Sequence, residues 1–428
     1  AGRLRVTPDP ERVRLTAAGR RTLLSAAASP ARYALMLLVI SLAGCGVLPR
    51  NPVPPDKVGA VVIPGMPDIR AWGGRPSSVM ERDLADSFAQ ESPAEFPIAA
   101  DGLIHYAHLA LSGGGANGAF GAGFLKGWTQ TGQRPVFKIV TGVSTGALMS
   151  PFAFLGPVHD DDLHELYTRT RTQDIIQLRL HALLPQLLAG DSLADSGPLA
   201  NLIARHVDAD LLREVAAAHR GGRRLYIGTV DLDAQQFVVW NMGMIAVSGR
   251  PDALDLFRSI MLASASIPIA FPPVFFEVMA DGRRYDEMHV DGGVGANVFL
   301  TGGVFRLSEV RKGSGRGQAR SDVFVIHNGQ LGPVRAPTRR TVRSIASRVL
   351  ETAGKAGVIG DLFRIYTISR REGADFHWVT IPHGVETAGS EFFDPERMTQ
   401  LYDVGYREAL AGPAWSTDLP GLRNTSTR

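Results

Sequence analysis

Residues 109–124 read LALSGGGANGAFGAGF, so that an apolar run enters a group of glycines and continues into small and aromatic residues. Gly113, Gly115 and Gly118 have the G-x-G-x-x-G spacing of a dinucleotide-binding turn, whose N–H groups hold a pyrophosphate. Such a turn needs an acidic residue about 20 positions further on to bind the ribose. No Asp or Glu occurs between these glycines and Asp160. The Gly-Lys-Ser/Thr sequence of a nucleotide-phosphate loop does not follow them either. The glycines therefore predict close backbone approach to a different negative charge.

The segments around this turn alternate between strand-like and helix-like patterns, which predicts βαβ units and a largely parallel sheet in an α/β fold. The expected strands are residues 104–112, 136–142, 224–232, 236–242 and 322–329. The expected helices are residues 119–132, 143–155, 338–372 and 394–411. The segment 181–207, rich in apolar residues and interrupted by prolines, is either a cap over a pocket or a further helical layer.

The second expected strand leads into Gly142, Ser144 and Gly146, which form the pattern G-x-S-x-G. A serine at a tight turn between a strand and a helix presents its hydroxyl above the edge of the sheet, and glycines on both sides allow close packing. A nucleophilic serine also needs a proton acceptor and donors for the oxyanion. Asp291, which ends an apolar stretch, is the candidate acceptor, and the N–H groups of residues 113–115 are the candidate donors.

Four segments occur in the order and near the spacing found in patatin-like phospholipases, and the chain resembles that family over roughly residues 104–330. They are SGGGANGAF (112–120), GVSTGAL (142–148), LASASIPIAFPPV (262–274) and VDGGVGANV (290–298).

The resemblance implies a three-layer α/β/α sandwich and a Ser–Asp dyad in place of a Ser-His-Asp triad. It makes Ser144 the nucleophile, Asp291 the general base, and Gly113, Gly114 and Gly115 the oxyanion hole. An arginine or lysine follows these glycines in some relatives, whereas Ala116 and Asn117 stand here. The scheme requires neither a metal nor an organic cofactor. Because an aspartate with its ordinary pKa near 4 is a weak base, Asp291 is expected in a restricted site that raises the pKa.

Other readings of these and neighbouring residues stay open at this point. His289 or His327 could complete a triad, although a structural role is the simpler expectation for both. Residues 159–166, HDDDLHEL, are expected to be a solvated helix start, with a metal site as the alternative. Residues 262–274 are expected to end a helix and form a pocket wall. The arginines in 335–348 mark either a solvated helix face or a contact with anionic head groups.

The first 45 residues have the order of an export signal: arginines, then the apolar run ALMLLVISLAG (34–44), then Cys45. This run is too short to span a bilayer as a helix. LAGC (42–45) resembles the lipobox of bacterial lipoproteins, which predicts lipidation of Cys45, the only cysteine of the chain. An ordinary signal peptide is the alternative. Since Gly46 is not the aspartate associated with inner-membrane retention, the outer membrane is the expected location.

Four regions are predicted along the 428 residues: a signal peptide at 1–44, a Pro-rich tether at 45–102, a catalytic domain at 103–415 and a tail at 416–428. The net charge of the chain is +3. Because the leader alone carries about +5, the net charge of the remaining residues is slightly negative. A nucleic-acid partner is therefore not expected.

The export signal and the serine turn predict a membrane-anchored serine hydrolase. The family resemblance implies a phospholipase A or esterase that cleaves carboxylic esters of phospholipids or related acyl lipids. An acyltransferase or thioesterase with the same dyad is a second hypothesis. A lipid-binding or partner-binding lipoprotein without catalysis is a third.

Overall fold

The computed structural model describes residues 50–178, 192, 194–333 and 337–420. The chain divides into two compact units, Ala1–Val47 and Leu48–Arg428. The first unit, and with it the predicted signal peptide and Cys45, lies outside the described residues, as do residues 421–428 of the predicted tail. Within the described ranges, no helix combines the length and the hydropathy needed to cross a bilayer.

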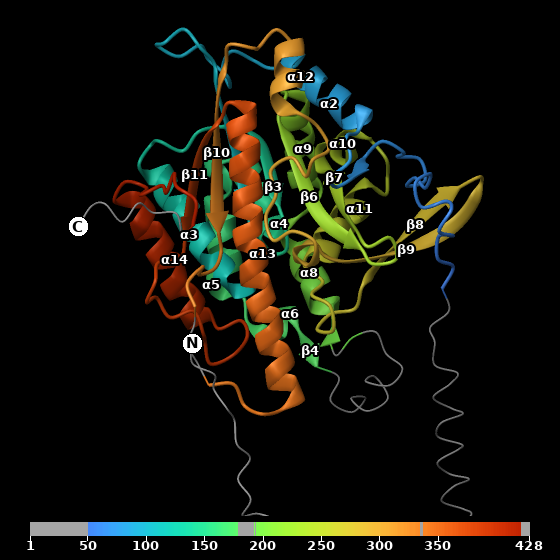
Figure 1. The fold of residues 1–428 in the computed structure, drawn as a ribbon, viewed down its shortest axis with the longest axis vertical. Helices are drawn as coiled ribbons and strands as arrows, with labels where there is room; N and C mark the ends of the chain where they lie inside the picture. Colours follow the sequence, from blue (N-terminus) through green and yellow to red (C-terminus); the bar gives the residue numbers. More distant parts are fainter. Residues whose placement is uncertain (1–49, 179–191, 193, 334–336, 421–428) are drawn as a thin grey trace, which may run out of the picture. The chain divides into compact units, whose positions relative to one another are not determined.

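The second unit is built on a mixed sheet whose nine strands run in the order β1-β7-β6-β3-β2-β10-β11, with a β8–β9 hairpin attached to β6 (Figure 1). The strands are β1 (Arg70–Trp72), β2 (His105–Leu111), β3 (Phe137–Gly142), β6 (Arg224–Asp231), β7 (Gln236–Asn241), β8 (Val274–Ala280), β9 (Arg283–Asp291), β10 (Arg320–His327) and β11 (Asp375–Thr380). The five strands β11, β10, β2, β3 and β6 are mutually parallel. The others are antiparallel to their neighbours. The predicted α/β fold with a mostly parallel sheet is confirmed.

Helices cover both faces of this sheet. The longer ones are α2 (Ser78–Ala89), α3 (Gly118–Gln130), α4 (Thr145–Leu155), α5 (Asp160–Arg169), α8 (Gly197–His206), α9 (Ala209–Arg220), α11 (Ala253–Ser264), α13 (Val342–Glu372) and α14 (Pro395–Leu410). The shorter elements are η1 (Gly115–Asn117), η2 (Pro157–His159), α6 (Thr172–Ile175), α10 (Met242–Val247), η4 (Gly292–Val294), α12 (Leu307–Gly313) and the pair β4 (Gln177–Leu178) and β5 (Ala194–Asp195).

The two faces of β2 belong to different parts of the core, as the two-residue period of a strand requires. Ala107, Leu109 and Leu111 pack with α3, α4 and α14. Tyr106 and Ala110 point the other way, toward α2 and α13 respectively. The central strands are thus buried on both sides, which explains their continuous apolar runs.

Residues 70–89 are packed into the folded unit, whereas the sequence predicted a tether for 45–102. β1 pairs with β7 at the sheet edge, and Met80, Leu84 and Phe88 of α2 are buried. These three side chains recur every four residues, the spacing of an amphipathic helix, but prolines on both sides obscured the pattern. Of the segment 181–207, residues 181–191 and 193 lie outside the described residues. The remainder includes α8, which packs against α11 and α6.

Candidate active site

Ser144 stands at a sharp turn between β3 and α4, at the carboxyl end of the parallel strands. Its backbone angles are φ 55° and ψ −126°, a region that side chains other than glycine rarely adopt. A Cβ on Gly142 would overlap the Gly146 carbonyl, and one on Gly146 would overlap the Leu111 carbonyl at the end of β2. The two glycines therefore let the turn pack directly against neighbouring backbone, and the strain at Ser144 costs about 1–3 kcal/mol.

Replacing Gly146 with alanine is expected to lower the free energy of unfolding by about 1–3 kcal/mol, because the new methyl group must displace backbone rather than a flexible side chain. Gly354→Ala is the matched control. Gly354 lies inside α13 with no atom within 4 Å of an added Cβ, so alanine there should raise stability by about 0.5–1 kcal/mol through helix propensity. Urea unfolding of both variants measures the two changes. Equal effects would contradict the close-packing argument.

Asp291 ends β9, opposite Thr229 of β6, and reaches the serine from there. The Ser144 Oγ donates a hydrogen bond of 2.7 Å to Asp291 Oδ2, while the Gly293 N–H donates to Oδ1 at 2.7 Å. Both side chains are nearly buried, with 8% of Ser144 and 5% of Asp291 exposed. The structure thus brings together the two residues that the sequence singled out, although 147 positions separate them.

Burial raises the pKa of Asp291 from 3.8 to about 6, against the opposing effect of the hydrogen bonds from Ser144 and Gly293. Neither candidate histidine reaches the serine. His289 lies between Thr229 and Glu287, and His327 bonds to Thr380. Burial lowers the pKa of His289 and lowers that of His327 to about 4. The arrangement is a hydrogen-bonded Ser–Asp pair without a histidine.

The glycine turn lies directly beside the serine. A Cβ on Gly113 would stand 3.2 Å from the Ser144 Cβ, and one on Gly114 would overlap the Asn328 carbonyl. The Gly113 N–H already donates to the Asn297 carbonyl at 2.9 Å. No hydrogen bond among the described residues uses the N–H of Gly114 or Gly115. Of the three predicted oxyanion donors, these two are available in the structure.

A narrow apolar pocket opens from Ser144. Its lining comes from several separate elements and comprises Gly115, Ser144, Thr145, Leu148, Leu166, Tyr167, Thr170, Ile175, Leu199, Leu202, Ala265, Ile267, Phe271, Phe392, Phe393 and Met398. Its cavity is only about 40 Å³, enough for a few water molecules but not for an acyl chain. A chain-like ligand could enter only if lining side chains moved. Phe392, 57% exposed, stands at the surface end.

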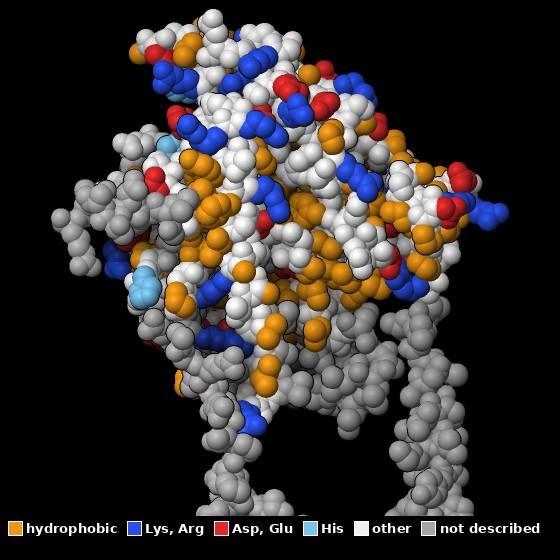
Figure 2. Space-filling model, viewed as in Figure 1, with side chains coloured by type: hydrophobic (Ala, Val, Ile, Leu, Met, Phe, Trp, Pro, Cys, Tyr) orange, Lys and Arg blue, Asp and Glu red, His pale blue; other side chains and the backbone are white. Residues whose placement is uncertain are grey.

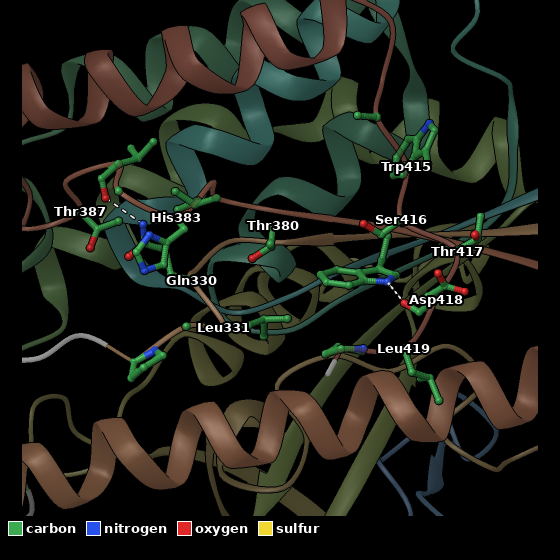
Figure 3. A pocket seen from close by; sticks show the side chains of 18 of the residues that line it. Gln330, Leu331, Thr380, His383, Thr387, Trp415, Ser416, Thr417, Asp418 and Leu419 are labelled. Carbon is green, nitrogen blue, oxygen red and sulfur yellow. Dashed lines mark hydrogen bonds between the residues drawn. The ribbon is translucent and has the colours of Figure 1, made fainter. Parts of the chain in front are cut away.

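A much larger cavity of about 1070 Å³ lies elsewhere, beside the edge strand β11 (Figure 3). Gln330 donates to the Val385 carbonyl at 2.8 Å on one side of it, and Trp378 donates to the Asp418 carbonyl at 2.8 Å on the other. Its lining contains neither Ser144 nor Asp291. The larger cavity is therefore separate from the Ser144–Asp291 pair.

Two groups of residues with metal-ligand chemistry are used in other ways. Asp231, Glu287 and His289 are close enough to share an ion, but the Arg70 guanidinium pairs with both carboxylate oxygens of Glu287. Residues 159–166 do start a helix, α5, and the Asp161 side chain is exposed as expected. Asp160 differs, because it is buried against Arg134 at 2.7 Å.

Several residues that support the dyad were missed in the sequence. The Ser264 Oγ accepts the Ser144 N–H at 3.0 Å, although residues 262–274 were expected to form only a pocket wall. The Asn297 N–H donates to Asp361 of α13 at 2.7 Å, which fixes the carbonyl that holds Gly113. Because these contacts join segments that are distant in the sequence, no local sequence pattern predicts them.

Comparison with known proteins gives one family match. Residues 109–302 match the model of patatin-like phospholipases, and no curated protein sequence matches significantly. Solved structures with similarity include VipD from Legionella pneumophila, at 14% identity and a TM-score of 0.37, covering 74% of this chain and 69% of that one. Human GIVD cytosolic phospholipase A2 has 12% identity and a TM-score of 0.34, with 80% and 64% covered. The type III effector ExoU has 14% identity and a TM-score of 0.31, with 72% and 52% covered.

Proposed function

We propose that this chain, which contains a patatin-like phospholipase domain at residues 109–302, hydrolyses carboxylic esters of phospholipids or related acyl lipids. The observation that supports the proposal most is the 2.7 Å hydrogen bond to the buried Asp291 from Ser144, which lines an apolar pocket. A serine beside a base, with N–H donors next to it, is the arrangement that acyl transfer requires.

In the proposed reaction, the Ser144 Oγ attacks the acyl carbonyl while Asp291 Oδ2 accepts the serine proton. The N–H groups of Gly114 and Gly115 stabilise the oxyanion. Asp291 then gives the proton to the leaving alkoxide as the ester bond breaks, which leaves an acyl-serine. Water, deprotonated by Asp291, attacks this acyl group, and return of the proton to Ser144 releases the carboxylic acid.

The proposed reaction has a defined pH dependence. Asp291 must be ionised to accept a proton, and burial raises its pKa to about 6. We therefore expect kcat/KM to rise with pH, to reach half of its maximum near pH 6, and to level off above pH 7. Initial rates on a soluble short-chain ester at constant ionic strength measure this profile. A profile that is flat between pH 5 and 7 would contradict the role of Asp291.

The experiment that tests the function is a panel of lipid esters incubated with the full chain, followed by analysis of the products. Release of free fatty acid supports hydrolysis, whereas acyl transfer to an added acceptor lipid in preference to water would favour the acyltransferase alternative. A fluorophosphonate probe identifies the nucleophile independently of the substrate. Labelling of folded protein at a residue other than Ser144, or no labelling at all, would contradict the proposed nucleophile.

We also propose that the protein is exported and held by lipidated Cys45, with the outer membrane as its location. The support is the sequence of residues 34–45 alone. Mass spectrometry of the mature N-terminus tests this part separately. A mature chain that begins elsewhere than at a diacylglyceryl-modified Cys45 would contradict the anchor and leave the hydrolase proposal unaffected.

A further inference from the structure

Helix α13 is far longer than the strands that it connects. It has 31 residues, about 46 Å at 1.5 Å per residue, whereas β10 has 8 residues and is about 26 Å long. Because α13 joins the parallel strands β10 and β11, it runs antiparallel to them, and its N-terminal half extends past the carboxyl edge of the sheet (Figure 1). We call residues 342–357 of this helix the overhang.

The overhang begins at the active site. A Cβ on Gly357 would lie 2.9 Å from the side-chain amide of Asn297, whose carbonyl holds the glycine turn. From Gly357 the helix continues for about 22 Å to its first residue. Among the side chains of α13 that the structure describes, the buried apolar ones, Val358, Leu362 and Ile365, all belong to the other half.

The overhang is amphipathic and presents apolar side chains to the outside. Ile345 is 51% exposed and Val349 is 60% exposed, and their spacing of four residues places them on one helix face. The sequence VRSIASRVLETAGKAG (342–357) repeats apolar residues at helical intervals. In the space-filling view, apolar side chains lie along the lower part of this helix (Figure 2). An apolar stripe of this kind is stable when it contacts an apolar phase.

The same segment is strongly basic in a unit that is otherwise slightly acidic. Residues 337–357 contain four arginines and one lysine against a single acid, Glu351. Arg339 and Arg340, just before the helix, are exposed. Basic residues beside an apolar helix face match the phosphate groups and the acyl region of an anionic bilayer, respectively.

Exposed apolar side chains also lie on segments that line the pocket or follow Asp291. Phe392 lines the pocket and is 57% exposed, Val294 follows the dyad aspartate by three residues and is 55% exposed, and Ile269 lies within the pocket-lining segment 265–271 and is 66% exposed. The apolar surface of the overhang therefore belongs to the same edge of the sheet as the entrance to the pocket.

We infer that the overhang and the exposed side chains of Ile269, Val294 and Phe392 form a surface that seats on an anionic lipid bilayer, with Ile345 and Val349 entering the acyl region and Arg339 and Arg340 meeting phosphate groups. The inference rests on the proposed function, because it explains how a nearly closed acyl pocket meets lipid. An anionic bilayer is favoured over a second copy of the chain, since one basic overhang repels another.

The test places a reporter on the overhang and on the opposite edge of the sheet. Since Cys45 is the only cysteine, C45S removes the background, and S144A prevents digestion of the vesicles. V349C and V158C are then labelled in turn with an environment-sensitive dye. Val158 is 79% exposed and follows α4, which leads away from the active-site edge. We expect vesicles of phosphatidylcholine and phosphatidylglycerol to shift the emission of the first label only.

A matched pair of variants measures the contribution to binding. In the same C45S and S144A background, I345S/V349S is expected to weaken vesicle partitioning by about tenfold or more. I98S/V158S, which removes the same residue types at positions 71% and 79% exposed near the other edge, is expected to leave it unchanged. Replacing Arg339 and Arg340 with glutamine should weaken binding to anionic vesicles by roughly thirtyfold and leave binding to neutral vesicles unaffected.

Equal emission shifts at both labels, a shift that depends on protein concentration without vesicles, or equal partitioning of both serine pairs would overturn the inference. Failure of the proposed function gives a different result. In that case the unmutated chain hydrolyses no soluble short-chain ester, whereas the label at position 349 still responds to vesicles.

Discussion

Replacing Ser144 with alanine is expected to lower kcat for ester hydrolysis by on the order of 10⁴-fold or more, because the acyl-enzyme route is lost with its nucleophile. The fold should survive, since the only side-chain hydrogen bond removed is the one to Asp291. Rates on a short-chain ester and urea unfolding of the same sample measure the two quantities.

Ser150→Ala is the matched control for this variant. Ser150 is a buried serine as well, but it lies inside α4 and its hydroxyl donates to the Ala147 carbonyl within the helix. Its variant should retain hydrolysis within a fewfold of the unmutated chain. If Ser144→Ala kept most of its activity, or if both variants lost it equally, the assignment of the nucleophile would be wrong.

Asp291→Asn is the second variant with a large expected effect: a loss of activity on the order of 10³–10⁴-fold together with a gain in stability. Asparagine can still accept the Ser144 hydrogen bond but cannot take up its proton. Burial raises the pKa of Asp291 from 3.8 to about 6, so the native state binds more protons than the unfolded chain between these values. The raised pKa of Asp291 therefore adds to the free energy of unfolding below pH 4, and this contribution is lost as pH rises through 6.

The asparagine variant should therefore have a free energy of unfolding up to about 3 kcal/mol higher at pH 8 and little changed at pH 4. Asp231→Asn provides the comparison, because Asp231 is a buried aspartate of β6 whose hydrogen bonds go to backbone N–H groups. It should keep activity on the soluble ester. Retained hydrolysis in Asp291→Asn, or a stability change independent of pH, would contradict the assigned role.

Four of the five parallel strands, β2, β3, β6 and β10, were predictable because they are rich in buried apolar residues and each is followed by a local signal for a turn or helix. The fifth, the edge strand β11, was not among the expected strands, since DFHWVT is only partly buried. β9 was not recognised as a full strand, since RRYDEMHVD lacks an apolar pattern. Glu287 and His289 are buried there only because Arg70 pairs with Glu287 across 217 positions. The buried charged residues of such a strand depend on a partner that is distant in the sequence, so the sequence of the strand alone does not predict it.

The site divides in the same way. Ser144 and Asp291 were predictable because each stands in a short glycine-flanked turn whose geometry is local. Ser264, Asn297 and Asp361 were not, because each acts through one hydrogen bond to a distant segment. Of the pocket lining, Ala265, Ile267 and Phe271 fall within the wall predicted for 262–274. The rest was not predictable, since it is assembled from side chains far apart in the sequence.

The two hydrogen bonds that link Asp361 to Asn297 and Asn297 to Gly113 have a mechanical consequence. They measure 2.7 and 2.9 Å, and such bonds weaken steeply beyond about 3.5 Å. A tilt of α13 that moved Asp361 by about 1 Å would therefore either break this two-bond linkage or pull the glycine turn with it. Because the same helix carries the overhang, a displacement of its outer end that tilted the helix would reach the glycine turn beside Ser144 through these two bonds.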